Sequence, residues 1–187
     1  MDDGYSVKFM LMGEKNSGKS TFVKYYEDGT IYSGDIGFYL PTVIIEYTRI
    51  YIEFYNKKLI LHFFDPSQVE QNHLFIKTFT RDIAIIFIFY DLTDRESFQK
   101  AKELFDMVKS VINKSEIIYV LISSKYDLYI KSAENTNKVP EEEALEFASK
   151  NNILFAHLSI AEKYSNGIIE LMDKVLKEYF KRNKVIW

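Results

Sequence analysis

A glycine-bounded loop near the N-terminus constrains the fold of this chain more than any other stretch. The loop, residues 13–20 with the sequence GEKNSGKS, follows an alternating apolar run that predicts a strand over 5–12. It precedes a segment that predicts a helix over 19–27, ending before an Asp-Gly turn. A strand, a loop with glycine near both ends, Lys-Ser and a helix form the phosphate-binding P-loop in its usual context. The sequence therefore predicts an α/β fold with an anion site on its first loop.

The residues of this loop suit the chemistry of bound phosphate. Gly13 and Gly18 allow the backbone to wrap closely around an anion, so that N–H groups point at phosphate oxygens. The following helix adds unsatisfied N–H groups and a partial positive charge at its N-terminus. Lys19 is placed to bridge the outer phosphates, and Ser20 to offer a hydroxyl to Mg²⁺. The alternative, a plain Gly/Ser turn, is disfavoured by the strand and the helix on either side.

The rest of the chain alternates between strand and helix patterns. Strand patterns form a hairpin and three apolar runs, at 43–54, 59–64, 83–90, 117–122 and 153–158. Three helices are predicted here: one that begins with a Thr-Asp-Arg-Glu capping box at 93–96, one from Pro140 to about Lys150, and one over 166–182. The pattern over 69–81 is ambiguous, and a polar loop precedes Pro140. This alternation predicts a parallel sheet covered on both faces, with one antiparallel strand that the hairpin adds at an edge.

Composition excludes several other classes of protein. A chain of 187 residues with 47% hydrophobic residues suits a single domain over 1–187, and a net charge of −3 gives no reason to expect nucleic acid as a partner. The absence of cysteine excludes a disulfide framework, a thiolate metal site and a lipid anchor on cysteine in this chain. The longest apolar run, 83–90, is too short to span a membrane, and no signal peptide is visible, so the expectation is a cytoplasmic protein.

The predicted sheet brings further polar loops to the same rim as the P-loop. Ligands bind in such sheets outside the carboxyl ends of the strands, which gathers the P-loop, residues 41–42, Asp65, residues 125–127 and the segment after 158. Asp65 is placed to hold Mg²⁺ through water, and Thr42 to add a second hydroxyl. A simple strand-ending turn is the alternative for Asp65, and the nearby P-loop disfavours it.

The loop after residues 117–122 carries residues that suit a guanine base. Asp127 is placed to accept hydrogen bonds from both N–H groups on the edge of guanine, a donor pair that adenine lacks. The stem of Lys125 is long enough to lie across the ring. Lys-x-Asp is a weak signal by itself, and its position after the P-loop and Asp65 is what makes it informative.

These stretches together resemble the Ras-like small GTPases, most closely the Rab branch. The matching segments are 13–20, 39–43, 90–98, 125–128 and 142–148. The resemblance implies a three-layer P-loop fold with a six-stranded sheet and five helices, and a GDP/GTP switch with Mg²⁺ in vesicle trafficking or signalling. The first switch would surround 41–42 and the second would span 65–80. The nucleotide contacts it implies are Lys15, Asn16, Ser17, Gly18, Lys19, Ser20, Thr21, Tyr32 (or Ile31), Thr42, Ser124, Lys125, Asp127, Leu128, Ala161, Glu162 and Lys163, with Ser20, Thr42 and Asp65 on the metal.

The second switch departs from the family pattern Asp-x-x-Gly-Gln. Gln68 occupies the glycine position and Val69 the position of the glutamine that orients the attacking water. A slip of one residue would let Gln68 serve as the catalytic residue, with Thr42 beside it. In the P-loop, Asn16 suits a positive φ, whereas Lys15 is bulky where the family keeps small residues near the γ-phosphate. These departures predict slow hydrolysis, with Lys15 a poor substitute for an arginine finger.

The base-reading loop and the last family motif also depart from the pattern. Ser124 stands in place of an asparagine, so guanine preference should survive through Asp127 with weaker affinity. The family's Ser-Ala-Lys aligns with 159–161 from the strand side or with 161–163 from the helix side. The second alignment is preferred because it keeps the spacing to Gly167.

Protein partners are expected to bind through the switch regions and the 43–64 hairpin. Tyr47 and Phe64 retain part of the aromatic cluster that Rab proteins show to effectors, while Asn72 replaces its third member. Ordinary core packing of these aromatics is an equal alternative. Without a lipid anchor, recruitment to membranes would go through partners or a missing C-terminal tail. The three histidines have no metal-ligand spacing.

Three functions compete on this sequence. The first is a nucleotide-switched binding protein with weak GTPase chemistry, supported by the P-loop, Thr42, Asp65 and Asp127 beside altered hydrolytic positions. The second is a pseudo-GTPase scaffold that binds nucleotide constitutively or not at all. The third, an ATP-dependent P-loop kinase, is disfavoured because no arginine-rich lid is visible and Asp127 does not suit adenine.

Overall fold

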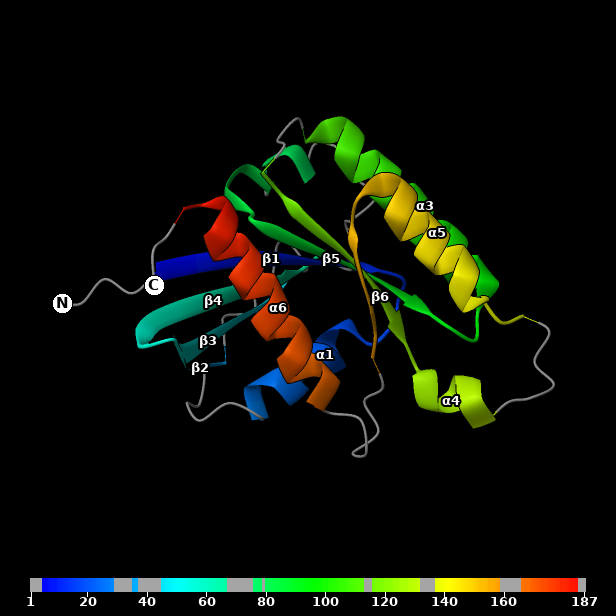
Figure 1. Ribbon diagram of the computed structural model, residues 1–187, viewed down its shortest axis with the longest axis horizontal. Coiled ribbons are helices and arrows are strands. Elements are labelled where there is room, and N and C mark those ends of the chain that lie inside the picture. The colour runs from blue at the N-terminus through cyan, green and yellow to red at the C-terminus, as the bar shows by residue number, and fades with distance from the viewer. Residues whose placement is uncertain are drawn as a thin grey trace.

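A mixed sheet forms the centre of the molecule in the computed structural model, which describes residues 5–28, 35–36, 45–66, 76–78, 80–112, 116–131, 137–158 and 166–184. The strand order is β2-β3-β4-β1-β5-β6-β7 (Figure 1). The strands are β1 (Tyr5–Gly13), β2 (Asp35–Ile36), β3 (Glu46–Phe54), β4 (Lys57–Asp65), β5 (Ile85–Asp91), β6 (Ile118–Ser124) and β7 (Leu154–His157).

The pairing of the strands confirms the predicted fold class. β1 runs parallel to β4 and to β5, and β5–β6 and β6–β7 are also parallel. β3 is antiparallel to β4, as the predicted hairpin requires. The six predicted strands are all present, and the two-residue strand β2 is added outside β3. Two residues are too short to produce a periodic pattern, so β2 had no signal in the sequence.

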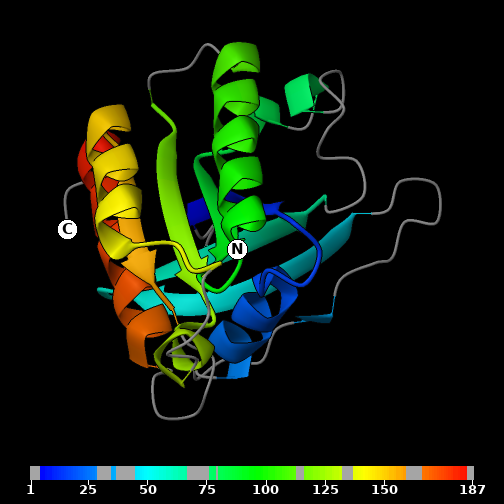
Figure 2. The same ribbon diagram turned by 90° about the vertical axis from the view of Figure 1, so that its right-hand side faces the viewer.

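Helices cover both faces of the sheet. α1 (Lys19–Asp28) and α6 (Asn166–Arg182) lie on one face, and α3 (Arg95–Val111) and α5 (Glu141–Asn151) lie on the other (Figures 1 and 2). A short helix, α4 (Tyr126–Lys131), lies at the same end of the sheet as α1, and a 3₁₀ turn, η1 (Thr80–Asp82), precedes β5. This arrangement is the predicted three-layer sandwich.

β1 shows how the sequence builds two separate cores. Phe9 and Leu11 are fully buried against α1 and α6, whereas Met10 and Met12 are buried in the core under α3. Successive side chains of a strand point to opposite faces, so an uninterrupted apolar run is what a strand buried on both faces needs. The central strands therefore hold the loops at their carboxyl ends on a rigid base.

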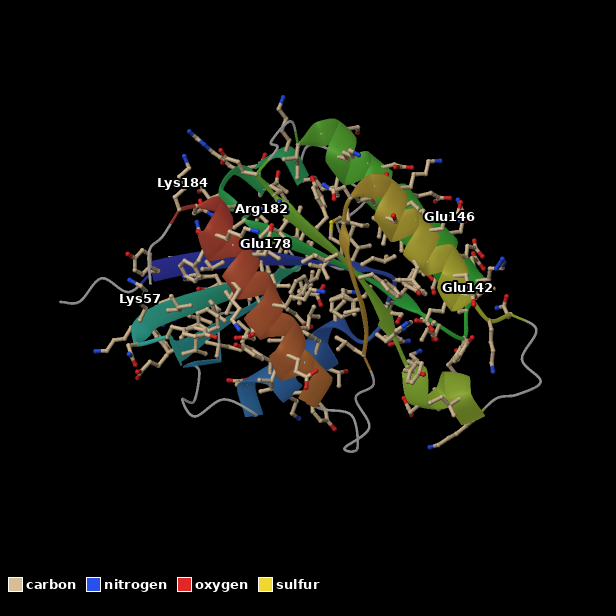
Figure 3. All side chains as sticks on the ribbon, in the orientation of Figure 1. Lys57, Glu142, Glu146, Glu178, Arg182 and Lys184 are labelled. Atoms are coloured by element: carbon tan, nitrogen blue, oxygen red, sulfur yellow. The ribbon has the colours of Figure 1, made fainter. Side chains whose placement is uncertain are left out.

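The outer faces of the helices are charged. Glu142 and Glu146 project away from α5, and Glu178 and Arg182 pair along α6 with a distance of 2.8 Å between Nε and Oε1 (Figure 3). Side chains four residues apart lie on the same side of a helix, so each pair marks one solvent-facing stripe. Among the described residues, no helix is both long and apolar enough to cross a bilayer.

Two local predictions were wrong. The N-cap of α3 is Asp94, whose carboxylate accepts the Glu96 N–H at 3.0 Å, and not Thr93, which instead bonds the carboxylate of Asp91. The polar loop before Pro140 contains the helix α4, which is too short to show a helical period. Asn152 ends α5 in a left-handed conformation with φ 54°, two residues after the predicted end at about Lys150.

Candidate functional site

The ammonium group of Lys19 lies inside the glycine-bounded loop. Its Nζ donates to the carbonyl oxygens of Gly13 at 2.6 Å and Glu14 at 2.8 Å, and the residue is only 4% exposed. Both acceptors are neutral, and no carboxylate pairs with Lys19 in the described part of the chain. A buried cation held by carbonyl groups is poised to bind an anion, because its charge is not compensated.

Three residues of the loop adopt backbone conformations that few side chains tolerate. Gly13 has φ 134°, and a Cβ atom placed on it would lie 2.4 Å from the carbonyl oxygen of Phe89 on β5. Gly18 has φ 94°, and Asn16 has φ 65°, as predicted for an asparagine in this loop. Gly13 is therefore required by the close approach of β5 as well as by the curvature of the loop.

The N-terminus of α1 follows directly after this loop. α1 begins at Lys19, and its first turn contains no acidic residue, so no carboxylate of that turn competes with an incoming anion. Ser17 is 2% exposed, and its hydroxyl has no hydrogen-bond partner among the described residues. The loop thus combines backbone N–H groups, a buried cation and a helix terminus, which is the set of groups that binds phosphate.

Ser20 lies between two carboxylates. Its Oγ is 3.4 Å from Oδ2 of Asp65 and 3.3 Å from Oε2 of Glu46. Glu46 and Asp65 are cross-strand partners at the end of the β3–β4 hairpin, and Asp65 is 4% exposed. Hydroxyl and carboxylate oxygens fit Mg²⁺. The described residues contain no group of three or more His, Cys, Asp or Glu side chains that could hold a metal ion.

Ser124 turns its hydroxyl toward the sheet. The Oγ donates to the carbonyl oxygen of Tyr90 at 3.0 Å, and the residue is 1% exposed. The Leu92 N–H in turn donates to the Ser124 carbonyl at 3.2 Å. Ser124 therefore ties β6 to the end of β5, whereas the asparagine expected in its place would link the base to the strand before the P-loop.

Lys125 is bound to Asp91 at the end of β5. Its Nζ lies 2.5 Å from Oδ2, while the other carboxylate oxygen accepts from the N–H and the hydroxyl of Thr93 at 2.8 and 2.7 Å. Partial burial opposes the charged form of Asp91. The hydrogen bonds from Lys125 and Thr93 outweigh this effect and hold the pKa of the carboxyl below its ordinary value. Lys125 itself has φ 60°, which turns the chain sharply into α4.

Asp127 and Leu128 occupy the first turn of α4. The N–H groups of Leu128 and Tyr129 both donate to the Lys125 carbonyl at 3.0 Å, so the turn is closed on Lys125. Leu128, the next residue after Asp127, is 47% exposed.

Strand pairing brings these loops to one rim of the sheet. Gly13 pairs with Phe89, Asp91 pairs with Ser124, and Ser123 pairs with His157. The P-loop, the end of β5, the base-reading loop and the end of β7 are therefore consecutive along the rim, as expected for parallel strands whose carboxyl ends meet at one edge.

Comparison with known proteins identifies the family. The model of the Ras family matches residues 8–181. This chain belongs to the Ras family of small GTPases. It is 26% identical over 181 residues to the Ras-related protein Rab-19 of Mus musculus, covering 97% of this chain and 78% of that protein. It is 24% identical over 176 residues to Rab-17 of Homo sapiens, covering 94% and 77%, and 28% identical over 133 residues to the GTP-binding protein YPTM1 of Zea mays, covering 71% and 62%. These relatives confirm the resemblance to the Rab branch.

Several predicted site residues of this Ras-family chain lie outside the described residues. They are Tyr32, Thr42, Gln68, Val69, Asn72, Ala161, Glu162 and Lys163. The roles assigned to them stay predictions. Lys15 in the loop and Thr21 in the first turn of α1 are described and exposed. The part of the site that the structure brings together is thus the P-loop, Asp65 and the loop from Ser124 to Leu128.

Three contacts of the site were not found from the sequence. Glu46 faces Ser20, as described above. Glu14 of the P-loop pairs with Lys100 of α3 at 2.5 Å, and Lys100 also lies 3.2 Å from Glu96. Asp91 binds Lys125. Except for the local contact with Glu96, each contact joins residues that are at least 26 positions apart in the sequence. No local sequence pattern therefore indicates them.

Proposed function

We propose that this chain is a guanine-nucleotide-dependent switch of the Rab type that hydrolyses GTP slowly. The observation that carries the proposal is the pair formed by Lys19, buried in the P-loop with only carbonyl partners, and Ser20, flanked by Asp65 and Glu46. Lys19 would bind the β- and γ-phosphates in place of the two carbonyl oxygens. Membership of the Ras family supports the same assignment.

The metal half of the site would be held by Ser20, Asp65 and Thr42, with Glu46 as an additional carboxylate in the outer shell. Magnesium bound there would supply neutralisation of the phosphate charge. Ser20 can turn its lone pairs toward a cation, because its hydroxyl is held by two long contacts of 3.3 and 3.4 Å rather than by one short bond. Asp65, at 4% exposure, is held in place by the hairpin and the sheet.

Guanine would be read by Asp127, which can accept from two N–H groups of that base. A buried site built on such hydrogen bonds rejects a base that lacks the donors, because its acceptor is then left unpaired. Lys125 is already held by Asp91, so its stem is fixed in direction before the base arrives. Preorganisation of this kind lowers the entropy lost on binding.

Slow hydrolysis rests on residues 68 and 69, with Val69 where a water-orienting glutamine is expected, and on the bulk of Lys15 beside the γ-phosphate. Single-turnover hydrolysis of GTP by the purified protein tests this part of the proposal. A Val69→Gln variant is expected to accelerate the reaction about tenfold or more, whereas Val69→Leu is not. A wild-type rate like that of an ordinary Ras-family protein, unaltered by Val69→Gln, would refute slow hydrolysis.

A pseudo-GTPase scaffold is the second candidate. The observation that favours it is that Ser124 and Lys125 already have partners within the protein, Tyr90 and Asp91. A nucleotide base would then gain fewer new contacts. Nucleotide released from the purified protein by denaturation and identified by chromatography separates the two functions. GDP or GTP supports the switch, and an empty protein that takes up neither with Mg²⁺ supports the scaffold.

Effector binding would use the outer surface of the β3–β4 hairpin. The rings of Tyr47 and Phe64 lie 5.0 Å apart, and the Tyr47 hydroxyl is 2.6 Å from Nδ1 of His62. The three side chains come from the two paired strands of the hairpin. We propose that this surface binds effectors in trafficking or signalling, and that such partners bring the protein to membranes.

A further inference from the structure

His157 occupies a position under the base-reading loop that the proposed function does not use. It is the last residue of β7 and the cross-strand partner of Ser123 at the end of β6. The Leu158 N–H donates to the Ser123 carbonyl at 2.7 Å, which closes the ladder directly before Ser124. His157 thus lies one strand away from the start of the residues that would contact the base.

The imidazole connects three elements through its two nitrogen atoms. Nδ1 lies 2.6 Å from Oγ of Ser123, which is fully buried, and Nε2 lies 3.0 Å from Oε1 of Glu141 in the first turn of α5. The carboxylate oxygen lies off the direction of the ring N–H, so the Glu141 contact is electrostatic rather than a directed hydrogen bond. It is nonetheless a contact that joins β7 to α5.

The neighbouring carboxylate decides the tautomer of the neutral ring. An ionised carboxylate only accepts, so the proton belongs on Nε2, and Nδ1 is then the acceptor for the hydroxyl of Ser123. The Ser123 hydroxyl also lies 3.4 Å from the Ala156 carbonyl, a weaker partner, and close to the Tyr90 side chain on β5. Its short contact of 2.6 Å is the one with His157.

The imidazole ring also contacts the loop itself. The ring of Tyr126 lies 5.4 Å from that of His157 at an interplanar angle of 39°, and the ring of Phe155 lies 4.6 Å from it in a T-shaped arrangement. Tyr126 also stacks on Tyr129 at 6.1 Å. Its ring therefore contacts both the imidazole of His157, at the end of β7, and a ring of α4. Tyr126 lies between Lys125 and Asp127 in the sequence, so a shift of its backbone would move both neighbours.

We propose that His157 is a positioning residue for guanine recognition, acting through Ser123 and Tyr126 on Asp127. The inference rests on the proposed function, since it concerns the base side of the same site. Contact between the rings of Tyr126 and His157 keeps both carboxylate oxygens of Asp127 directed at the base. When this contact is lost, α4 shifts, and the hydrogen bond from Asp127 to the 2-amino group of guanine weakens first.

Two nucleotides distinguish positioning from general stability. GDP offers two N–H donors to Asp127, whereas IDP lacks the 2-amino group and offers one. His157→Leu is expected to release GDP about tenfold faster, to change IDP release far less, and so to reduce the preference for GDP over IDP. His157→Asn, whose side-chain oxygen can replace Nδ1 at Ser123, should recover part of this preference. A merely structural role would accelerate both nucleotides equally.

A second pair of variants protects the test against misfolding. Glu141→Gln removes the charge beside Nε2 and is expected to release GDP about two- to threefold faster. Glu142→Gln, the adjacent carboxylate that projects from α5 in Figure 3, is the matched control and should leave release unchanged. In the ¹⁵N spectrum of the wild type at pH 8, Nδ1 of His157 should be the unprotonated nitrogen.

The outcomes separate the two proposals. If the wild type binds neither GDP nor GTP with Mg²⁺, the proposed function fails and the inference with it. If the wild type binds GDP but His157→Leu and Glu141→Gln release GDP and IDP at wild-type rates, the function stands and the role of His157 is refuted. A loss of GDP preference in His157→Leu that His157→Asn partly restores supports the assignment.

Discussion

The phosphate side and the base side of the site are built in different ways. On the phosphate side, Lys19 and Ser20 belong to eight consecutive residues, and the partners of Lys19 are backbone carbonyls of the same loop. On the base side, the side chains of Ser124 and Lys125 find their partners on β5. The first half is therefore specified by local sequence, and the second by contacts between distant elements.

This difference shows where a divergent chain can change. Phosphate is bound chiefly by backbone N–H groups and one lysine, so the P-loop can carry the exposed Lys15 and an Asn16 whose φ of 65° suits asparagine. On the base side, the change to serine at 124 comes with a hydroxyl that is buried and bonded to Tyr90. Tertiary contacts there replace what the family motif supplies locally.

The largest expected effect comes from Lys19→Ala on the phosphate side. The variant removes a buried charge and its bonds to two phosphates, so the Kd for GDP with Mg²⁺ should rise on the order of 100-fold. Titration calorimetry measures it. Lys24→Ala, an exposed lysine of the same helix, serves as the control. An unchanged Kd would mean that the P-loop does not bind the nucleotide.

Asp127→Asn tests the base side most directly. An amide offers one acceptor and one donor, so it loses guanine's 2-amino group and gains the 2-oxo group of xanthine. We expect the Kd for GDP to rise roughly 100-fold and that for XDP to fall, measured by competition with a labelled nucleotide. Asp106→Asn on the exposed surface of α3 is the control. Equal loss of both nucleotides would contradict base reading by Asp127.

Glu46→Gln asks whether the hairpin contributes to the metal half. Removing one of the two carboxylates beside Ser20 should raise the Mg²⁺ concentration needed to slow GDP release about fivefold, since charge on the ligands sets affinity for the ion. Release rates across a magnesium titration give this value. Glu53→Gln, an exposed carboxylate on the same strand, should leave the curve in place. If Glu46→Gln shifts the magnesium dependence no more than Glu53→Gln does, Glu46 does not contribute to the metal site.

Asp91→Asn weakens the hold on Lys125 without touching the base. With the charge gone, the stem of Lys125 is no longer fixed, and GDP release should accelerate about threefold to fivefold. Stopped-flow release measures the change, which should be insensitive to magnesium concentration. An effect that disappears at saturating magnesium would place Asp91 on the phosphate side instead.

The smallest expected effect also concerns Asp91, and it is a change in the free energy of unfolding at low pH. Because the pKa of Asp91 is held below its ordinary value, the folded state prefers the charged form, and its contribution to stability is present above pH ~4. It is lost as the pH falls through the lowered pKa of the folded state. Denaturant unfolding of wild type and Asp91→Asn should therefore differ by less than about 1 kcal/mol at pH 7 and converge toward pH 2. A difference that persists at pH 2 would exclude this origin.

Much of the fold was readable from the sequence because its signals are local. The apolar runs of the central strands, the glycines of the P-loop and the α6 pattern each depend on neighbours within a few residues, and the predicted bounds of α6 agree with the structure. Asp94 replaced Thr93 as the cap of α3 because Thr93 was taken up by Asp91, a contact that spacing does not reveal. The six-residue α4 was missed for want of a period.

The site shows the same division. The sequence located Lys19, Ser20 and Asp65 because a motif carries them in order, and the structure places these three together. It did not locate Glu46, Asp91 or His157, whose side chains contact residues far away in the sequence. Side chains that act on one another through a sheet leave no trace in the spacing along one strand.

The close approach of Gly13 to Phe89 has a consequence for how a bound nucleotide leaves. The P-loop begins at Gly13, which is still paired with β5 in the middle of the sheet. The start of the loop therefore cannot open unless β1 and β5 separate. The loop after β6, in contrast, is held by the side-chain contact of Lys125 with Asp91 and continues into the short helix α4. Dissociation of a bound nucleotide should therefore begin with the guanine base and end with the phosphates.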